Sequence, residues 1–264
     1  MSESQASLSR ELEAQIEEER ARHDMQYRRV SADDDLSMKY GAEFAPSDTR
    51  AALVYAFDQL GPLPGKRLLE LGGGAGWHAS MLVWRGAHVV TTDVSPVGLE
   101  IATRRFAANG MQDRTQVLVT PAESMPFADA EFDCLFGVAV LHHLDMDLAG
   151  PEIARVLKPG GRAVFLEPLS ENPVLDFVRD YVPYPGKKSP KGHRGVTYDI
   201  IHDAGRHFAR TSVRHFYLTS MINRALGQDI AITPLEALDT VLLRAFPATR
   251  KFTRHVVLTF EKSP

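Results

Sequence analysis

The sequence predicts an α/β protein built on a doubly wound, mainly parallel sheet. Between Lys66 and Leu166, short apolar runs alternate with stretches of helical period. The runs are apolar throughout, which is typical of parallel strands that helices cover on both faces. A glycine-rich turn, Gly72–Gly76, follows the first run, at the edge of the sheet where such folds bind ligands.

Five strands and three helices are expected in this part of the chain. Each helix is followed by residues that are typical of turns: Gly86, Gly110 or the run Pro159-Gly160-Gly161. The expected strands are Arg67–Leu71, Ala87–Thr92, Thr115–Val119, Phe132–Val138 and Arg162–Leu166. The expected helices are Trp77–Arg85, Pro96–Asn109 and Ala149–Leu157.

Helices are predicted before this core. Residues 7–30 contain no Gly or Pro and place Leu8, Leu12 and Ile16 at four-residue spacing, which predicts an amphipathic helix. Its apolar stripe is thin, so it packs either on the body or on another subunit, and a homo-oligomer through this helix is one expectation. A second helix is expected over Ser47–Leu60, before Gly61-Pro62.

The part after the core is less regular. We expect helices over Pro173–Asp180, Thr197–His207 and Leu235–Ala245, strands over Ser212–Leu218 and His255–Phe260, and a loop over Val182–Gly195. The chain therefore divides into an N-terminal helical lid segment (1–60), a cofactor-binding core (61–170) and a substrate-pocket segment that adds the last two strands (171–264).

Composition excludes several classes of protein. With 264 residues, 24% charged and 44% hydrophobic, the chain is neither low-complexity nor wholly disordered. The single cysteine, Cys134, allows no intramolecular disulfide and no Cys-based zinc site, so we expect a cytoplasmic protein. No run of 18 apolar residues is present, so no membrane span is expected.

The charge of the chain is unevenly distributed. The total of −4 divides into −9 for residues 1–170 and +5 for residues 171–264. A basic last part predicts an anionic acceptor or surface near it, although scattered solvated arginines give the same balance. The basic stretch Lys187–Arg194 has no interleaved aromatic residues, which argues against nucleic-acid binding.

The glycine turn has the spacing E-x-G-x-G-x-G from Glu70 to Gly76. The dinucleotide pattern G-x-G-x-x-G needs a glycine where Trp77 stands, and no Gly-Lys-Ser/Thr follows, so neither NAD nor a P-loop nucleotide fits. Glycines let the backbone approach a ligand that carries no phosphate at this turn. Asp93, which ends the second strand, is placed to accept both hydroxyls of a ribose.

Six motifs in order then resemble one family. LELGGGAG, TTD, AESMPFADAEFD, LHHL, LKPGG and LEP, within residues 65–170, look like the class I S-adenosylmethionine-dependent methyltransferases. The closest subgroup includes ubiquinone and menaquinone biosynthesis enzymes and many small-molecule methyltransferases of bacterial secondary metabolism. The resemblance implies a Rossmann-like seven-stranded sheet with the last strand antiparallel, N-terminal helices and a helical lid insertion. It also implies S-adenosylmethionine as cofactor and S-adenosylhomocysteine as product.

The resemblance further implies a set of cofactor-binding residues. In many relatives an aspartate before the alanine of the third motif meets the adenine; here that position is Pro121, so the contact falls to the Ala122 backbone or to Glu123. Tyr27 and Tyr40 are expected as lid residues over the methionine end of the cofactor. The full set is Glu70, Gly72, Gly73, Gly74, Gly76, Asp93, Val94, Ala122, Glu123, Val138, Tyr27 and Tyr40.

Two residues are candidates for catalysis. His142 is expected at the pocket mouth as an acid, base or substrate contact, with a structural role in the turn as the alternative. Glu167, at the end of the fifth strand, is either a base or part of a turn that Pro168 fixes. No metal site is expected, since His142 and His143 are adjacent and no third ligand is in view.

The sequence thus predicts methyl transfer to a small organic acceptor by in-line displacement, where alignment supplies most of the rate. Carbon methylation of an aromatic, quinone-like or prenylated compound is favoured by the resemblance, and oxygen or nitrogen methylation of a natural product or sugar is the alternative. Two other readings stay open: a protein that binds the cofactor without transfer and serves as a partner, and an enzyme that catalyses a different reaction, such as a cyclisation.

Overall fold

The computed structural model describes residues 3–28, 36, 47–181, 194–221 and 232–264. Within them a seven-stranded sheet has the order β3-β2-β1-β4-β5-β7-β6. β7 pairs antiparallel with β5 and β6, and every other neighbouring pair is parallel, so the predicted sheet with its antiparallel last strand is confirmed. The strands are β1 (Arg67–Leu71), β2 (His88–Asp93), β3 (Thr115–Val119), β4 (Phe132–Val138), β5 (Leu157–Pro168), β6 (Arg210–Phe216) and β7 (His255–Glu261).

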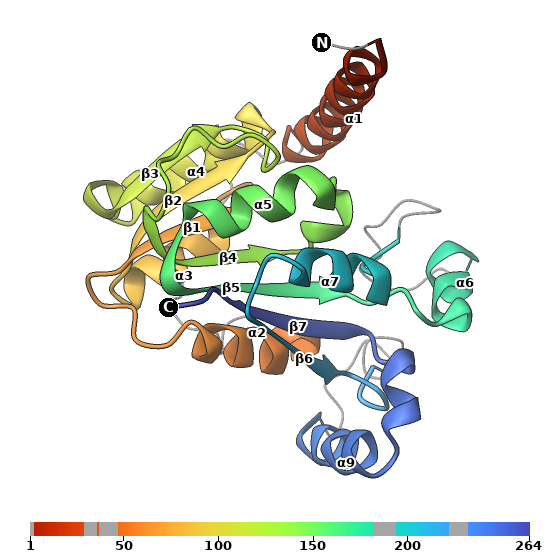
Figure 1. The fold of residues 1–264 in the computed structure, drawn as a ribbon. Helices are drawn as coiled ribbons and strands as arrows, with labels where there is room; N and C mark the ends of the chain where they lie inside the picture. The colour runs from red at the N-terminus through yellow and green to blue at the C-terminus, as the bar shows by residue number, and fades with distance from the viewer. Residues whose placement is uncertain (1–2, 29–35, 37–46, 182–193, 222–231) are drawn as a thin grey trace.

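Helices cover the sheet on both faces (Figure 1). One buried cluster joins the sheet to α2, α3 and α4, and a second joins its other face to α5 and α7. The described helices are α1 (Glu3–Tyr27), α2 (Ser47–Gln59), α3 (Trp77–Trp84), α4 (Pro96–Ala108), α5 (Met146–Val156), α6 (Pro173–Tyr181), α7 (Tyr198–Gly205) and α9 (Ile232–Ala245), with short 3-10 turns η2 (Gln112–Arg114), η3 (Leu141–His143) and η4 (Pro247–Phe252).

The central strands are buried because both of their faces are apolar. Successive residues of β1 alternate between the two clusters: Leu68 contacts the α2 side and Leu69 the α5 side. β6 lies at the edge of the sheet, and its first five residues are exposed. A continuous apolar run therefore predicts a central strand well, and it carries less information at an edge.

β5 begins five residues earlier than predicted. Leu157 already pairs with Phe132, and the register shifts before Cys134 pairs with Arg162. The run Pro159-Gly160-Gly161, read in the sequence as a turn before the strand, is therefore an irregularity within it.

The last part of the chain belongs to the same sheet as the core. β7 inserts between β5 and β6, and α2, from the N-terminal segment, packs on β5 and β7. Because β1, β2, β4 and β5 are parallel, their carboxyl ends lie at the same edge of the sheet. Segments from both ends of the chain also lie at this edge.

The C-terminal half of α1 packs at this edge, beside α4, whereas its N-terminal half extends away from the sheet (Figure 1). Leu12 and Ile16 of the predicted apolar stripe are half-buried. Packing on the body thus accounts for part of the stripe, and the oligomer remains a prediction.

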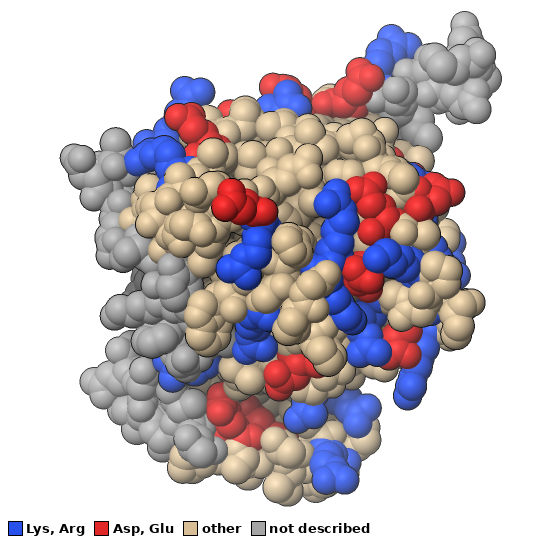
Figure 2. Space-filling view, turned by 90° about the vertical axis from the view of Figure 1, so that its left-hand side faces the viewer, with Lys and Arg blue, Asp and Glu red and all other residues tan. Residues whose placement is uncertain are grey.

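Charges are mixed on the face shown in Figure 2, where basic and acidic side chains are interspersed over the height of the molecule. The charge split along the sequence does not divide this face into an acidic and a basic half. No helix in the described part of the chain is long and apolar enough to cross a membrane.

Candidate active site

The glycine turn after β1 is held tightly to the end of β2. The Gly73 N–H donates to the Thr92 carbonyl at 3.0 Å, and the Gly74 N–H donates to Asp93 Oδ2 at 2.8 Å. Gly74 has a φ of +47°, and a Cβ there would lie 1.9 Å from the Tyr27 hydroxyl. The turn therefore leaves room for the Tyr27 side chain from α1.

Asp93 joins the turn to the start of α4. Its Oδ1 accepts the Ser95 N–H at 2.8 Å while Oδ2 accepts that of Gly74. Burial raises the pKa of Asp93 above its usual range, and the two backbone hydrogen bonds act in the opposite direction. Each carboxylate oxygen retains acceptor capacity, so the group can also bind hydroxyl donors in the cavity.

Glu70 lies buried beneath the turn. Its Oε2 accepts the Thr91 hydroxyl at 3.1 Å, and Oε1 has no hydrogen-bond partner among the described residues. Burial raises the pKa of Glu70 to about 8, so the carboxyl is mainly protonated at neutral pH. An unsatisfied polar atom this close to the turn fits a site that receives a polar ligand.

A cavity of about 220 Å³, here the cofactor cavity, lies between the turn and α1. One side of α1 roofs it, and three polar contacts fix the helix there. Gln15 Nε2 donates to the His143 carbonyl at 3.1 Å, Arg20 Nε donates to the Val94 carbonyl at 3.0 Å, and the Ser95 hydroxyl donates to Asp24.

The structure brings most of the predicted cofactor residues to this cavity. The predicted residues in its lining are Tyr27, Gly72, Asp93, Val94, Ala122, Glu123 and Val138. Glu70, Gly73 and Gly74 form the turn and its support rather than the lining. Gly76 faces α4, where a Cβ would lie 2.8 Å from both Ala102 and Phe106. Tyr40 lies outside the described residues.

The histidine pair is placed differently from the expectation. His142 is buried, and its Nδ1 lies 2.8 Å from Glu167 Oε2. Glu167 Oε1 also accepts the N–H groups of Val140 and Leu141. His143, not His142, lines the cofactor cavity. The arrangement of His142 and Glu167 is that of a buried support for the turn after β4.

His143 meets two residues of α1. One potential metal-ligating atom from each of Glu19, His23 and His143 lies within 4.8 Å of those of the other two. The sequence did not reveal that residues of α1 approach His143 in this way. The Arg22 guanidinium donates to Glu19 and lies 3.2 Å from His23 Nε2. A cation at this point disfavours a metal ion, and the group instead fastens α1 over the cavity.

A second cavity of about 320 Å³, called the acceptor cavity after the role proposed for it below, adjoins the first. Val138 and Ala139 line both. The other described residues of its lining are mostly apolar and include no lysine or arginine: Thr49, Leu53, Trp77, His78, Leu166, Pro168 and His255.

His78 is a residue that the sequence analysis missed. It is the second residue of α3, just after the glycine turn, and its side chain makes no hydrogen bond with any described residue. Burial lowers the pKa of His78 to about 4, so its ring is neutral at pH 7. Its position on the first turn of the helix after the glycine motif was the available signal.

Part of this chain is similar in sequence to known proteins. Residues 69–165 match the family model described as "Methyltransferase domain". The ubiquinone/menaquinone biosynthesis C-methyltransferase UbiE of Brucella anthropi is 39% identical over 124 residues, which cover 44% of this chain and 46% of that protein. The chain thus aligns with about half the length of such curated relatives.

Solved structures share the fold over a longer stretch. The geranyl diphosphate C-methyltransferase of Streptomyces coelicolor, in complex with Mg²⁺, geranyl diphosphate and S-adenosylhomocysteine, aligns with 94% of this chain and 98% of its own, with a TM-score of 0.61 and 14% identity. The [4+2]-cyclase SpnF aligns with 81% of each chain, with a TM-score of 0.56 and 21% identity. At these identities the likeness concerns the fold.

Proposed function

We propose that this chain, whose residues 69–165 belong to the methyltransferase domain family, transfers a methyl group from S-adenosylmethionine to a small organic acceptor. One observation carries the proposal: a cavity under the glycine turn and an apolar cavity beside it meet at Val138 and Ala139. A donor and an acceptor held in two adjoining cavities are aligned for direct transfer.

The residues present fit the cofactor. Asp93 would accept the ribose hydroxyls, Val94 and Ala122 would contact the adenine, and Glu123 would meet its amino group. Glu70 Oε1, which lacks a partner among the described residues, and the Tyr27 hydroxyl would lie at its methionine end. When bound, the cofactor supplies an electrophilic methyl group on a sulfonium.

The acceptor cavity favours a neutral, apolar reacting group. Leu53, Trp77 and Leu166 give it an apolar wall, and none of the described lining residues is a lysine or an arginine that could pair with an anion. We therefore propose carbon methylation of an aromatic, quinone-like or prenylated compound, which the name of the UbiE relative also supports. Oxygen or nitrogen methylation is the alternative.

His78 would position the acceptor. A neutral imidazole carries one donor and one acceptor nitrogen, so it can accept a hydrogen bond from a hydroxyl or take the proton of an acidic carbon. His142 and Glu167, being buried and mutually paired, would instead hold the turn that carries Val138 and Ala139.

Cofactor binding is tested by calorimetry with S-adenosylhomocysteine. Asp93→Asn should weaken binding by roughly 100-fold, since it removes a charged acceptor from two ribose hydroxyls. The matched control is Asp113→Asn, on an exposed residue of η2, which should bind as the parent does. Equal affinities in all three proteins would contradict the assignment of the cavity.

Transfer is tested with labelled S-adenosylmethionine and a library of apolar aromatic and prenylated compounds, read by mass spectrometry for a gain of CH₂. His78→Gln should lower kcat/KM by roughly 10- to 100-fold and leave S-adenosylhomocysteine affinity unchanged. The exposed His88→Gln is the control. An unaffected His78→Gln would remove His78 from the mechanism while leaving methyl transfer in place.

The same assay distinguishes methyl transfer from the two other hypotheses, a partner protein without transfer activity and an enzyme that catalyses a different reaction. A protein that binds S-adenosylhomocysteine but labels no compound in the library or in a cell extract would be a partner protein. A product of unchanged mass that forms only with the cofactor present would indicate other chemistry, such as the cyclisation named for the fold neighbour SpnF. The cytoplasmic location is likewise a proposal, supported by the single buried cysteine.

A further inference from the structure

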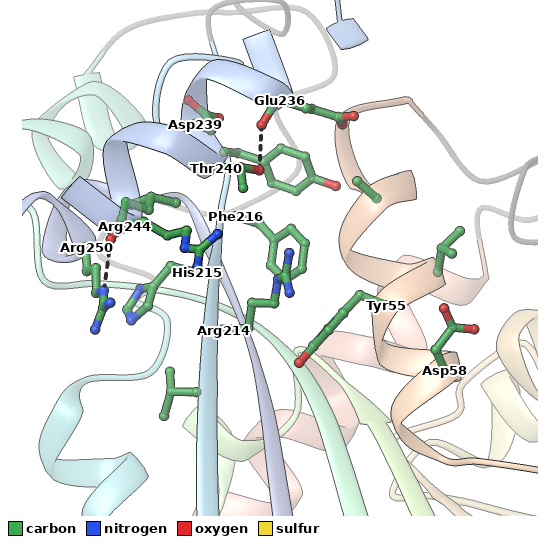
Figure 3. A pocket seen from close by; sticks show the side chains of 15 residues that line it. Tyr55, Asp58, Arg214, His215, Phe216, Glu236, Asp239, Thr240, Arg244 and Arg250 are labelled. Carbon is green, nitrogen blue, oxygen red and sulfur yellow. Dashed lines mark hydrogen bonds between the residues drawn. The ribbon is translucent and has the colours of Figure 1, made fainter. Parts of the chain in front are cut away.

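A cavity of about 690 Å³ lies between α2, β6, α9 and η4 (Figure 3), and we call it the β6 groove. It shares no lining residue with the cofactor cavity or the acceptor cavity. Tyr217 forms part of the wall that separates it from the acceptor cavity. The Tyr217 hydroxyl accepts the Ala52 N–H of α2 at 3.0 Å, and its ring packs edge-on against His255 at 5.7 Å. The groove is thus a separate site.

Three arginines from three elements line the groove: Arg214 of β6, Arg244 of α9 and Arg250 of η4. None of them pairs with a carboxylate among the described residues. The Arg250 side chain makes one long hydrogen bond, from Nε to the Leu243 carbonyl at 3.4 Å, which leaves its terminal nitrogens available. Elsewhere in the described chain, arginines such as Arg155 and Arg194 pair with acids.

The acidic side chains of the groove do not neutralise these arginines. Asp239 accepts hydrogen bonds from the backbone and hydroxyl groups of residues 218–220, which fixes that loop. Burial and the charge of Asp239 raise the pKa of Glu236. Asp58 lies on α2, whereas Arg244 and Arg250 gather with His215 on the other side of the cavity (Figure 3).

An aromatic surface lies beside the positive charge. The rings of Tyr55 and Phe216 stand 5.5 Å apart, and the Arg214 guanidinium lies 4.6 Å from the Tyr55 ring and 5.6 Å from the Phe216 ring. Burial and the charge of Arg250 lower the pKa of His215 to about 4, so it is a neutral hydrogen-bonding group at pH 7. Planar guanidinium groups next to apolar rings suit a ligand with an oxyanion and a flat apolar part.

We propose that the β6 groove is a second ligand site, which takes a small organic phosphate with an aromatic or similarly flat apolar body. The phosphate meets the guanidinium groups of Arg244 and Arg250, where bidentate contacts are available, and the apolar body lies against Tyr55 and Phe216. This site is distinct from the place of methyl transfer, and it gives the positive charge of the last part of the chain a specific location.

The test is calorimetry of the whole chain with 1-naphthyl phosphate as probe and saturating S-adenosylhomocysteine present, which blocks the cofactor cavity. We expect one saturable site. The double variant Arg244→Gln/Arg250→Gln should weaken binding by roughly 10- to 100-fold, as expected for the loss of charge-assisted hydrogen bonds. Tyr55→Leu should weaken naphthyl phosphate more than inorganic phosphate, since only the former uses the ring.

The matched control is Arg206→Gln, an exposed arginine that pairs with Asp147 and Asp203 away from the groove. It should bind the probe as the parent does. Melting curves and S-adenosylhomocysteine affinity establish that each variant is folded. The proposal is overturned by the absence of saturable binding, by equal losses in Arg206→Gln and the double variant, or by competition between the probe and S-adenosylhomocysteine.

Discussion

The ionisable side chains at the cofactor cavity are bonded within the fold, whereas the arginines of the β6 groove have no acidic partner among the described residues. At the cofactor cavity, Glu70 and Asp93 are buried, and each carboxyl group accepts hydrogen bonds from the chain itself, so these two groups are part of the fold. In the groove, Arg214, Arg244 and Arg250 are exposed, and no described carboxylate pairs with them. Charge changes in the cavity should therefore alter stability, and charge changes in the groove should alter ligand binding alone.

The largest effect should come from Glu70→Gln. The pKa of Glu70 is about 8 in the folded state and about 4.5 in the unfolded chain, so both states hold the proton at low pH. As pH rises above 4.5 the unfolded chain loses this proton first, so the free energy of unfolding falls until the folded carboxyl ionises near pH 8. The upper limit of this loss is roughly 5 kcal/mol.

Because glutamine stays neutral, Glu70→Gln should match the parent at about pH 4 and exceed its stability at about pH 9. Urea unfolding at a series of pH values measures this. The control Glu100→Gln, on the exposed face of α4, should keep the pH dependence of the parent. A parallel pH dependence in Glu70→Gln would show that Glu70 is already ionised in the fold.

Gly76→Ala should have the second largest effect. Its φ is +74°, and the added Cβ would lie 2.8 Å from Ala102 and Phe106, so α4 must move. We expect a loss of roughly 2–3 kcal/mol in thermal or urea unfolding. Gly110→Ala has a similar φ of +64° but open space around the Cβ, so it should cost roughly 1 kcal/mol. Equal losses would mean that backbone strain, rather than packing on α4, explains Gly76.

Glu167→Gln should follow. An amide can keep one acceptor but presents an N–H₂ group either to His142 or to the N–H groups of Val140 and Leu141. We expect a loss of roughly 2 kcal/mol, together with weaker S-adenosylhomocysteine binding, because the turn after β4 lines the cofactor cavity. A fully stable variant that binds normally but transfers no methyl group would instead favour Glu167 as a base.

The smallest effect should come from Arg244→Gln in the groove. Its exposed guanidinium makes no described hydrogen bond or ion pair, so the free energy of unfolding should change by less than about 0.5 kcal/mol at any pH. Urea unfolding at about pH 5 and pH 9 measures it. A loss above 1 kcal/mol would mean that this arginine is a structural group and would end the contrast between the two regions.

Much of the fold was available from the sequence. The bounds of β1, β3 and β4 were predicted as they stand. For β1 and β4 this is because a buried parallel strand needs a continuous apolar run and leaves a direct signal, whereas β3 lies at an edge of the sheet and is only partly buried. β5 was predicted too short because the glycine pair at 160–161 looks like a turn, and only pairing with β4 reveals the strand. Tyr27, Asp93 and Val138, which the resemblance implied as cofactor contacts, line one cavity, and their contact with the cofactor stays a prediction.

The rest of the site required the three-dimensional arrangement. His142 and His143 are adjacent in sequence, and the 3-10 turn after Ala139, whose φ is +52°, decides which of them enters the cavity. The acceptor cavity takes residues from α2, α3, β4, β5 and β7, a set with no common sequence pattern.

By itself, the sequence predicted the core strands, the glycine turn and the acidic residue at the end of β2, because each leaves a pattern within a few neighbouring positions. The contact between that residue, Asp93, and the turn joins positions 19 apart in the chain and belongs to the tertiary structure. The sequence also determined that residues 171–264 carry a balance of +5. Only the tertiary structure decided where three of these positive charges lie. Acidic and basic side chains are interspersed on the face shown in Figure 2, while Arg214, Arg244 and Arg250 line one groove because β6, α9 and η4 surround it. The net charge of a segment is a sum that ignores where its residues lie. A binding site for an anion requires that several positive side chains line one cavity and are not already paired with acids.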